Sequence, residues 1–144
     1  MLDVAQLSVS YGKHMALEAV SLSVGRGEIV VMLGANGAGK SSCLKALGGI
    51  VRHMPGARIA LGGSDITALQ PHEMVEAGLA LVPEDRGIFA DLTVRENLLL
   101  AARRARTLDQ IDTQRLDWLF RLFPALKKFW LFPAGKLSGG QKQR

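Results

Sequence analysis

This sequence has a single cysteine, few aromatic residues and no long apolar run. Cys43 stands alone, which excludes an intramolecular disulfide and is typical of a protein kept in a reducing cytoplasm. No apolar stretch approaches the roughly 20 residues that a membrane-spanning helix needs. The N-terminus lacks the basic and then apolar pattern of a signal peptide. We therefore predict a globular domain in which Cys43 is a small core residue.

The composition is that of an ordinary globular domain. The chain has 144 residues, of which 48% are hydrophobic and 22% charged, enough for one domain with a core. The net charge is +5, and basic residues cluster at Arg103, Arg104, Arg106, Lys127 and Lys128. We interpret these clusters as solvated helix faces and expect no nucleic-acid partner.

The most informative stretch is a glycine-rich segment that follows a short apolar run. It fits the phosphate-binding pattern G-x-x-x-x-G-K-[ST] at every fixed position. Residues 29–33 before it are apolar and β-branched, which predicts a buried parallel strand, and residues 41–47 after it predict a helix. The motif consists of Gly34, Ala35, Asn36, Gly37, Ala38, Gly39, Lys40 and Ser41, with Ser42 directly after it.

Each residue type in this motif suits a polyphosphate. Glycines let backbone N–H groups point inward as an anion-binding nest, and the following helix N-terminus adds partial positive charge. Lys40 is a mobile charge able to reach the terminal phosphates. The Ser41 hydroxyl is a hard oxygen ligand for a magnesium ion that bridges those phosphates, and Ser42 offers another hydroxyl to them. We therefore predict that this segment binds phosphate.

Two alternatives for the motif are weaker. A glycine turn with an incidental lysine would have to match four specified positions and both flanks by chance. A dinucleotide fingerprint, G-x-G-x-x-G, is excluded because Ser42 stands where the third glycine belongs.

The first ninety residues alternate between strand and helix patterns. Residues 7–11 and 20–24 alternate apolar and polar side chains, which predicts an antiparallel β layer. Residues 58–61 and 79–82 predict two further strands, the second of them buried. Between these strands, Pro71 and Gly78 mark the start and end of a helix. This alternation predicts right-handed crossovers and a mostly parallel sheet.

From residue 91 the pattern becomes helical. Thr93 and Glu96 form a capping box at a helix start. A later apolar stripe ends at Pro124 and consists of Ile111, the stem of Arg115, Leu119 and Leu122. Residues 129–133 are apolar and aromatic, and we favour core packing over a partner surface for them. Residues 91–136 are thus predicted to form a small helical subdomain.

A second glycine-rich motif follows about a hundred residues after the first. Ser138 and Gln141 have the spacing of a capping box, and Gly139 and Gly140 leave the first N–H groups of that helix unshielded. This predicts a second anion-receptive helix start. Taken alone, the motif would be interpreted as a capped helix after a glycine turn.

Together the two motifs resemble those of the ATP-binding subunits of ATP-binding cassette (ABC) transporters, in which LSGGQ is the signature motif. The resemblance covers residues 1–144. It implies an α/β P-loop NTPase fold of the ABC ATPase type: an antiparallel β layer, a mostly parallel core sheet and an inserted helical subdomain, incomplete at the C-terminus. It assigns the β layer and phosphate-loop core to residues 1–90, the helical subdomain to 91–136 and the signature to 137–144.

The resemblance also assigns individual residues. Tyr11 lies where the family carries an aromatic residue that stacks on adenine, with packing on the sheet as the alternative. Glu84 lies in the family's Q-loop, where glutamine is usual, and its place implies magnesium or water coordination. Glu followed by Arg in this loop is similar to the branched-chain amino acid uptake subfamily, as are residues 88–89, 92–98 and 122–124.

The mechanism implied by the resemblance needs two subunits. Two chains, in a homodimer or heterodimer, sandwich two ATP molecules, each between the phosphate loop of one chain and the signature motif of the other. Ser138 and the amides of Gly139 and Gly140 would contact the γ-phosphate, with Gln141 beside them. Lys40, Glu84 and Ser138 would act in hydrolysis, and Ser41 and Glu84 would hold Mg²⁺. Permease subunits would dock on the Q-loop and helical region, at the cytoplasmic face of the inner membrane.

The family continues beyond the signature motif with an apolar strand ending in Asp, a catalytic Glu and a switch His. None of these follows Arg144 in this sequence. We therefore expect a C-terminally truncated subunit of an amino-acid importer that binds ATP weakly and hydrolyses little. The alternatives are a soluble ABC-type ATPase and a non-catalytic nucleotide-binding fragment.

Overall fold

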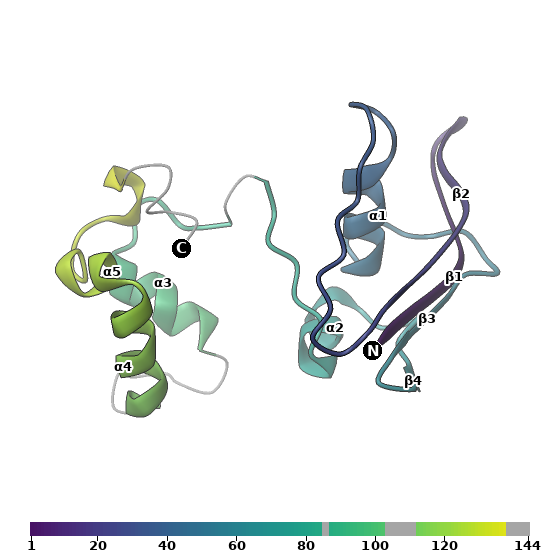
Figure 1. The fold of residues 1–144 in the computed structure, drawn as a ribbon. Helices are drawn as coiled ribbons and strands as arrows, with labels where there is room; N and C mark the ends of the chain where they lie inside the picture. Colours follow the sequence, from purple (N-terminus) through teal and green to yellow (C-terminus); the bar gives the residue numbers. More distant parts are fainter. Residues whose placement is uncertain (85–86, 103–111, 138–144) are drawn as a thin grey trace. The chain divides into compact units, whose positions relative to one another are not determined.

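The computed structural model describes residues 1–84, 87–102 and 112–137 (Figure 1). The chain forms two compact units, Met1–Leu81 and Val82–Arg144. The first unit contains a sheet and two helices, and the described part of the second is helical. Within the described residues, no helix combines the length and the apolar character needed to cross a membrane.

A four-stranded sheet forms one layer of the first unit. Its order is β2-β1-β3-β4, and each of its pairings is antiparallel. The two long strands confirm the predicted antiparallel layer, while the short strand β4 was not predicted. The bounds are Leu2–Tyr11 for β1, His14–Val24 for β2, Arg58–Leu61 for β3 and Ser64–Asp65 for β4.

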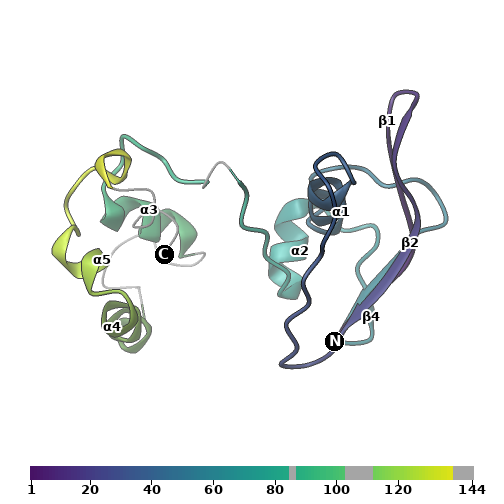
Figure 2. The same ribbon diagram turned by 45° about the horizontal axis from the view of Figure 1, so that its top comes forward.

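Two helices cover one face of this sheet (Figures 1 and 2). They are α1, Lys40–Leu47, and α2, Pro71–Ala77, whose predicted start at Pro71 and left-handed end at Gly78 are confirmed. Burial raises the pKa of the Cys43 thiol, so this predicted core residue stays protonated. Among the described residues, the largest fully buried side chains are Leu7, Val9, Cys43, Ile59 and Met74.

Where β1 and β2 change register, two serine hydroxyls accept hydrogen bonds from the backbone N–H groups that would otherwise bond to the opposite strand. Gln6 and Ala19 have backbone φ values of 54° and 47°, which residues other than glycine rarely adopt. The Gln6 N–H donates to Ser21 Oγ at 3.0 Å, and the Ala19 N–H donates to Ser8 Oγ at 2.9 Å. These bulges shift the side-chain alternation, so that Leu7 rather than Gln6 points into the core.

The two predicted buried parallel strands are not formed. Residues 29–33 and 79–82 pair with no strand in the described part of the chain. Ile29 is 91% exposed, and Val82 is 80% exposed. An apolar, β-branched run shows that a segment suits burial, but a buried parallel strand also needs neighbouring strands to pair its backbone. Non-local contacts decide whether such neighbouring strands are present. No described strand pairs with these two segments, and the prediction is wrong for both of them.

The described part of the second unit is helical, and its helices lie within residues 91–136, for which helices were predicted. It contains α3, Val94–Ala101, α4, Thr113–Leu122, and α5, Pro124–Lys128, followed by a short 3₁₀ turn, η2, Ala134–Lys136. The helical run ends at Leu122 as predicted, but Pro124 then begins α5, because proline suits a first helical turn. Ile111, the first member of the predicted stripe, lies outside the described residues.

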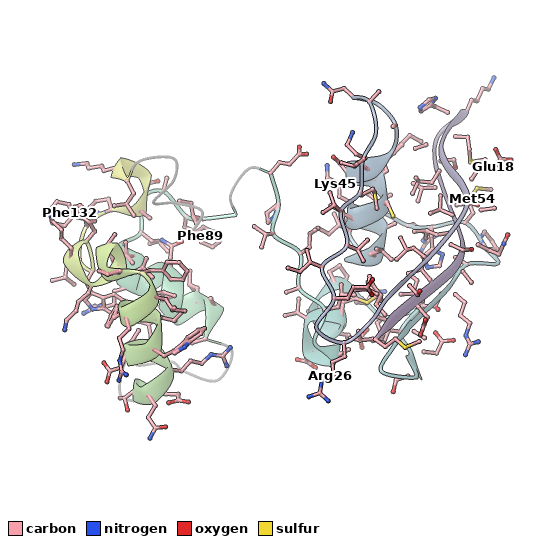
Figure 3. The ribbon with its side chains drawn as sticks, viewed as in Figure 1. Glu18, Arg26, Lys45, Met54, Phe89 and Phe132 are labelled. Atoms are coloured by element: carbon pink, nitrogen blue, oxygen red, sulfur yellow. The ribbon has the colours of Figure 1, made fainter. Side chains whose placement is uncertain are left out.

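In the aromatic segment 129–133, some side chains pack against neighbouring rings and others are exposed. Trp130 packs edge to face on Phe120, with ring centroids 5.2 Å apart, and Phe129 meets Phe132 in the same way at 5.6 Å. Leu131 nevertheless remains exposed. Phe132, which is labelled in Figure 3, is exposed as well. The prediction of core packing is therefore right for Trp130 and wrong for Leu131 and Phe132.

The predicted capping box at the start of α3 is confirmed. The Glu96 N–H donates to Thr93 Oγ1 at 3.2 Å, and the Thr93 N–H donates to Glu96 Oε2 at 2.8 Å. The Thr93 hydroxyl also donates to Glu96 Oε2 at 2.7 Å. These bonds, with the hydroxyl as the main cause, hold the pKa of Glu96 below its ordinary value. The ionised carboxylate is thus favoured in the folded state.

We expect Thr93→Ala to lower the free energy of unfolding by about 1 kcal/mol, because the cap is lost. It should also reduce the acid sensitivity of the second unit. A lowered folded-state pKa contributes stability above the carboxyl's ordinary pKa and loses it as pH falls through the lowered value. Urea unfolding from about pH 7 to about pH 3 measures both effects. An equal acid-induced loss in wild type and Thr93→Ala would contradict the role assigned to the hydroxyl.

Candidate functional site

The predicted phosphate loop leads directly into α1. Gly39 occupies the N-cap position with φ 85°, and no side chain caps the helix. Within the loop, the Ala38 N–H donates to the Ala35 carbonyl at 3.2 Å, which closes a turn. Gly39 thus gives the first turn of α1 no side-chain acceptor at the N-cap position. Such a helix end favours an anion, since its N–H groups and dipole both point outward.

Lys40 folds back over the loop that precedes it. Its Nζ atom donates to the carbonyl oxygens of Gly34 and Ala35, each at 2.7 Å. These bonds bring the first and last parts of the motif together, so the ammonium group and the uncapped helix end lie on one curled segment. Their combined charge suits a polyphosphate tail better than a neutral ligand.

Gly39 brings this loop close to strand β2. A Cβ atom at Gly39 would lie 2.4 Å from the Ala16 carbonyl oxygen and 2.8 Å from Leu17 Cδ2. Gly37 has a similar φ of 87°, yet a Cβ there would meet nothing within 4 Å. Gly39 is therefore required both by its backbone conformation and by the space it occupies, whereas Gly37 is required only by its conformation.

Tyr11 lies beside the helix that follows the loop. It is the last residue of β1, and its hydroxyl donates to Ser42 Oγ at 3.3 Å. The Tyr11 side chain is about half exposed, and Ser42 is half-buried in the first turn of α1. The structure thus brings Tyr11, Lys40 and Ser42 into one region. Ser41, the proposed magnesium ligand, is exposed in the same helical turn.

The remaining predicted site residues belong to the second unit, and four of them lie outside the described residues. Glu84 is exposed and belongs to the second unit, whereas Ser41 belongs to the first. Ser138, Gly139, Gly140 and Gln141 lie outside the described residues. Across residues 1–84, 87–102 and 112–137, no group of three or more His, Cys, Asp or Glu side chains is placed to hold a metal ion. The pairing of Ser41 with Glu84 on magnesium therefore stays a prediction.

Two contacts of this region were missed by sequence reasoning. The Tyr11–Ser42 hydrogen bond spans 31 residues, and the approach of Gly39 to Ala16 spans two elements that the motif does not include. The position of Tyr11 directly before the turn at Gly12 is a weak signal that it lies at a strand end. Nothing in a single sequence indicates which helix that strand end meets.

Comparison with known proteins supplies the family. The sequence profile of the family described as ABC transporter matches residues 17–144. The chain is 40% identical over 144 residues to the high-affinity branched-chain amino acid transport ATP-binding protein BraG of Pseudomonas aeruginosa, covering 99% of this chain and 60% of that protein. It is 36% identical to the probable branched-chain amino acid transport ATP-binding protein LivF of Archaeoglobus fulgidus, covering 99% and 59%. The chain thus spans about 60% of the length of these relatives.

Solved structures agree with this assignment. An ATP-binding subunit of an ABC transporter is 31% identical, with a TM-score of 0.82 over 99% of this chain and 58% of that one. A dimeric bacterial ABC transporter cassette, 22% identical with a TM-score of 0.78 over 99% and 66% of the two chains, shares the fold. These likenesses confirm the predicted ABC ATPase fold class. The chain therefore belongs to the ABC transporter family.

Proposed function

We propose that this chain is the ATP-binding part of an ABC importer and that it binds ATP with Mg²⁺ through residues 34–42. One observation carries the proposal: Lys40 is bonded to the carbonyls of Gly34 and Ala35, directly beside the uncapped start of α1. A single curled segment therefore presents a fixed positive charge and a helix end to the same ligand. Polyphosphate is the ligand class that uses both.

The side chains of this segment, together with Tyr11, contact different parts of the nucleotide. Lys40 binds the terminal phosphates and neutralises charge that develops on them during transfer. Ser41 and Ser42 contribute hydroxyls, and Tyr11 offers a half-exposed ring to the base. The donor set fits magnesium, which prefers hard oxygen ligands such as a hydroxyl and phosphate oxygens. Ser41 would hold the Mg²⁺ ion, which would supply positive charge to offset the charge of the phosphates.

Hydrolysis and transport are proposed for an assembly of two such subunits. Glu84 and Ser138 complete the catalytic set with Lys40, and residues 138–141 of one subunit contact the nucleotide held by the other. The dimeric cassette among the related structures supports the pairing of two subunits. Permease subunits at the cytoplasmic face of the inner membrane are the proposed transport partners, because the relatives are named as transport ATP-binding proteins.

The same relatives support a proposal for the solute class. Both BraG and LivF are named for branched-chain amino acid transport. We propose a branched-chain amino acid or a similar small solute as the transported molecule. Native co-purification with integral membrane subunits would support this importer. A strictly soluble native complex would favour the alternative of a soluble ABC-type ATPase.

Titration of the 144-residue chain with nucleotides tests the binding step. We expect MgATP to bind at least about ten-fold more tightly than AMP, because each lost charge-assisted phosphate contact costs about 1.5–3 kcal/mol. Chelation of Mg²⁺ should weaken ATP binding, and AMP binding should not change. Isothermal titration calorimetry measures all four affinities. Equal affinities for ATP and AMP would contradict a site built for polyphosphate.

A further inference from the structure

We propose that the hydroxyl of Tyr11 is a positioning group for the phosphate site, acting through Ser42 and separately from any contact of its ring with a base. The inference rests on the proposed binding of ATP by residues 34–42. It assigns to Tyr11 two functions that can be separated: the ring for the base and the O–H for the phosphates.

The first step is the polarity of the hydrogen bond. Tyr11 Oη donates to Ser42 Oγ at 3.3 Å. A serine hydroxyl has one hydrogen and two acceptor sites, so accepting from Tyr11 leaves its hydrogen available. Phosphate oxygens accept hydrogen bonds but donate none while ionised. When the Ser42 hydroxyl accepts the hydrogen bond from Tyr11, its own hydrogen is directed elsewhere. The hydroxyl can then donate to a phosphate oxygen, which can only accept.

The second step is the alternative open to Ser42 without this bond. A serine in a helix can turn its hydroxyl back to the carbonyl three or four residues earlier, which for Ser42 is that of Gly39 or Ala38 in the loop. The hydrogen is then used on that carbonyl and is lost to a ligand. The Tyr11 bond draws Ser42 Oγ toward the strand end and away from that arrangement.

The third step is the rigidity of the pair. Tyr11 ends β1, and its register partner across the turn is His14, the first residue of β2. Strand β2 in turn contacts the loop at Gly39, where only glycine fits beside the Ala16 carbonyl. The tip of the hairpin and the first turn of α1 are therefore held together near both residues.

The test is Tyr11→Phe, measured with MgATP and with inorganic tripolyphosphate, which has no base. We expect both ligands to bind about 5-fold more weakly, because the loss lies in the phosphate contact of Ser42. A stacking role alone would leave both affinities unchanged, since phenylalanine keeps the ring. Tyr11→Ala should weaken ATP further than Tyr11→Phe, but tripolyphosphate by the same factor as Tyr11→Phe.

Ser42 supplies the controls that exclude a merely structural effect. In a Ser42→Ala background, adding Tyr11→Phe should cost no further affinity, because the hydroxyl has lost its partner. In a Ser42→Thr background, which keeps a hydroxyl, the 5-fold loss should return. Unchanged tripolyphosphate affinity in Tyr11→Phe, or an equal loss with and without the Ser42 hydroxyl, would overturn the inference. Lys40→Ala, measured in parallel, tests the proposed function itself: if it binds like wild type, the phosphate site is wrong, whatever Tyr11 does.

Discussion

Lys40→Ala is expected to weaken MgATP binding about 100-fold, because the variant removes the charged donor that the loop holds in place. Lys40 Nζ lies 2.7 Å from the carbonyl oxygens of both Gly34 and Ala35. These two bonds hold the charge within the motif and restrict the side chain, which lowers the entropy that Lys40 loses on binding a phosphate. Loss of one or two charge-assisted phosphate bonds costs about 3 kcal/mol, which corresponds to roughly two decades in affinity.

Lys45→Ala is the matched control for this experiment. Lys45 lies on α1 in the same unit, carries the same charge and is exposed (Figure 3). Lys45 lies more than one helical turn beyond Lys40 along α1 and is not part of the motif. Replacing it with alanine changes the net charge by the same amount as Lys40→Ala but leaves the motif intact. We expect its affinity for MgATP to stay within about 2-fold of wild type, since exposed charges a turn away are screened. A similar loss in both variants would show that net charge, and not the Lys40 contact, attracts the nucleotide.

The features predicted correctly from sequence are set by short spacings. Pro71 and Gly78 bound α2, and Thr93 with Glu96 caps α3, because these residues act on backbone groups within one or two turns. The phosphate loop belongs to the same class. Its glycines and Lys40 meet within seven residues, so the motif alone predicts that they lie together.

The features missed from sequence depend on partners far along the chain. Residues 29–33 have the composition of a buried strand, yet no described strand pairs with them, and Ile29 is exposed. The contact between Tyr11 and Ser42 joins a strand end to a helix start 31 residues later. The sequence pattern of a segment indicates the conformation that the segment prefers. Which segments pair with one another depends on tertiary packing, which the pattern does not contain.

The second large effect is expected for Gly39→Ala, which should lower the free energy of unfolding of the first unit by about 2–4 kcal/mol. Two costs add. Alanine is strained at a φ of 85°, and its Cβ would lie 2.4 Å from the backbone carbonyl oxygen of Ala16. A backbone carbonyl cannot move aside as a flexible side chain would, so either β2 or the loop must shift.

Gly37→Ala separates these two costs. Its φ of 87° matches that of Gly39, but a Cβ there would meet nothing within 4 Å. We therefore expect only the conformational cost, about 1–2 kcal/mol, in urea unfolding followed by circular dichroism. The nucleotide affinity should follow the same order, because a shift at Gly39 displaces Lys40 and Ser42 from the loop they complete. Equal destabilisation by the two variants would mean that strand β2 does not constrain the phosphate loop, and the coupling between hairpin and loop would have to be abandoned.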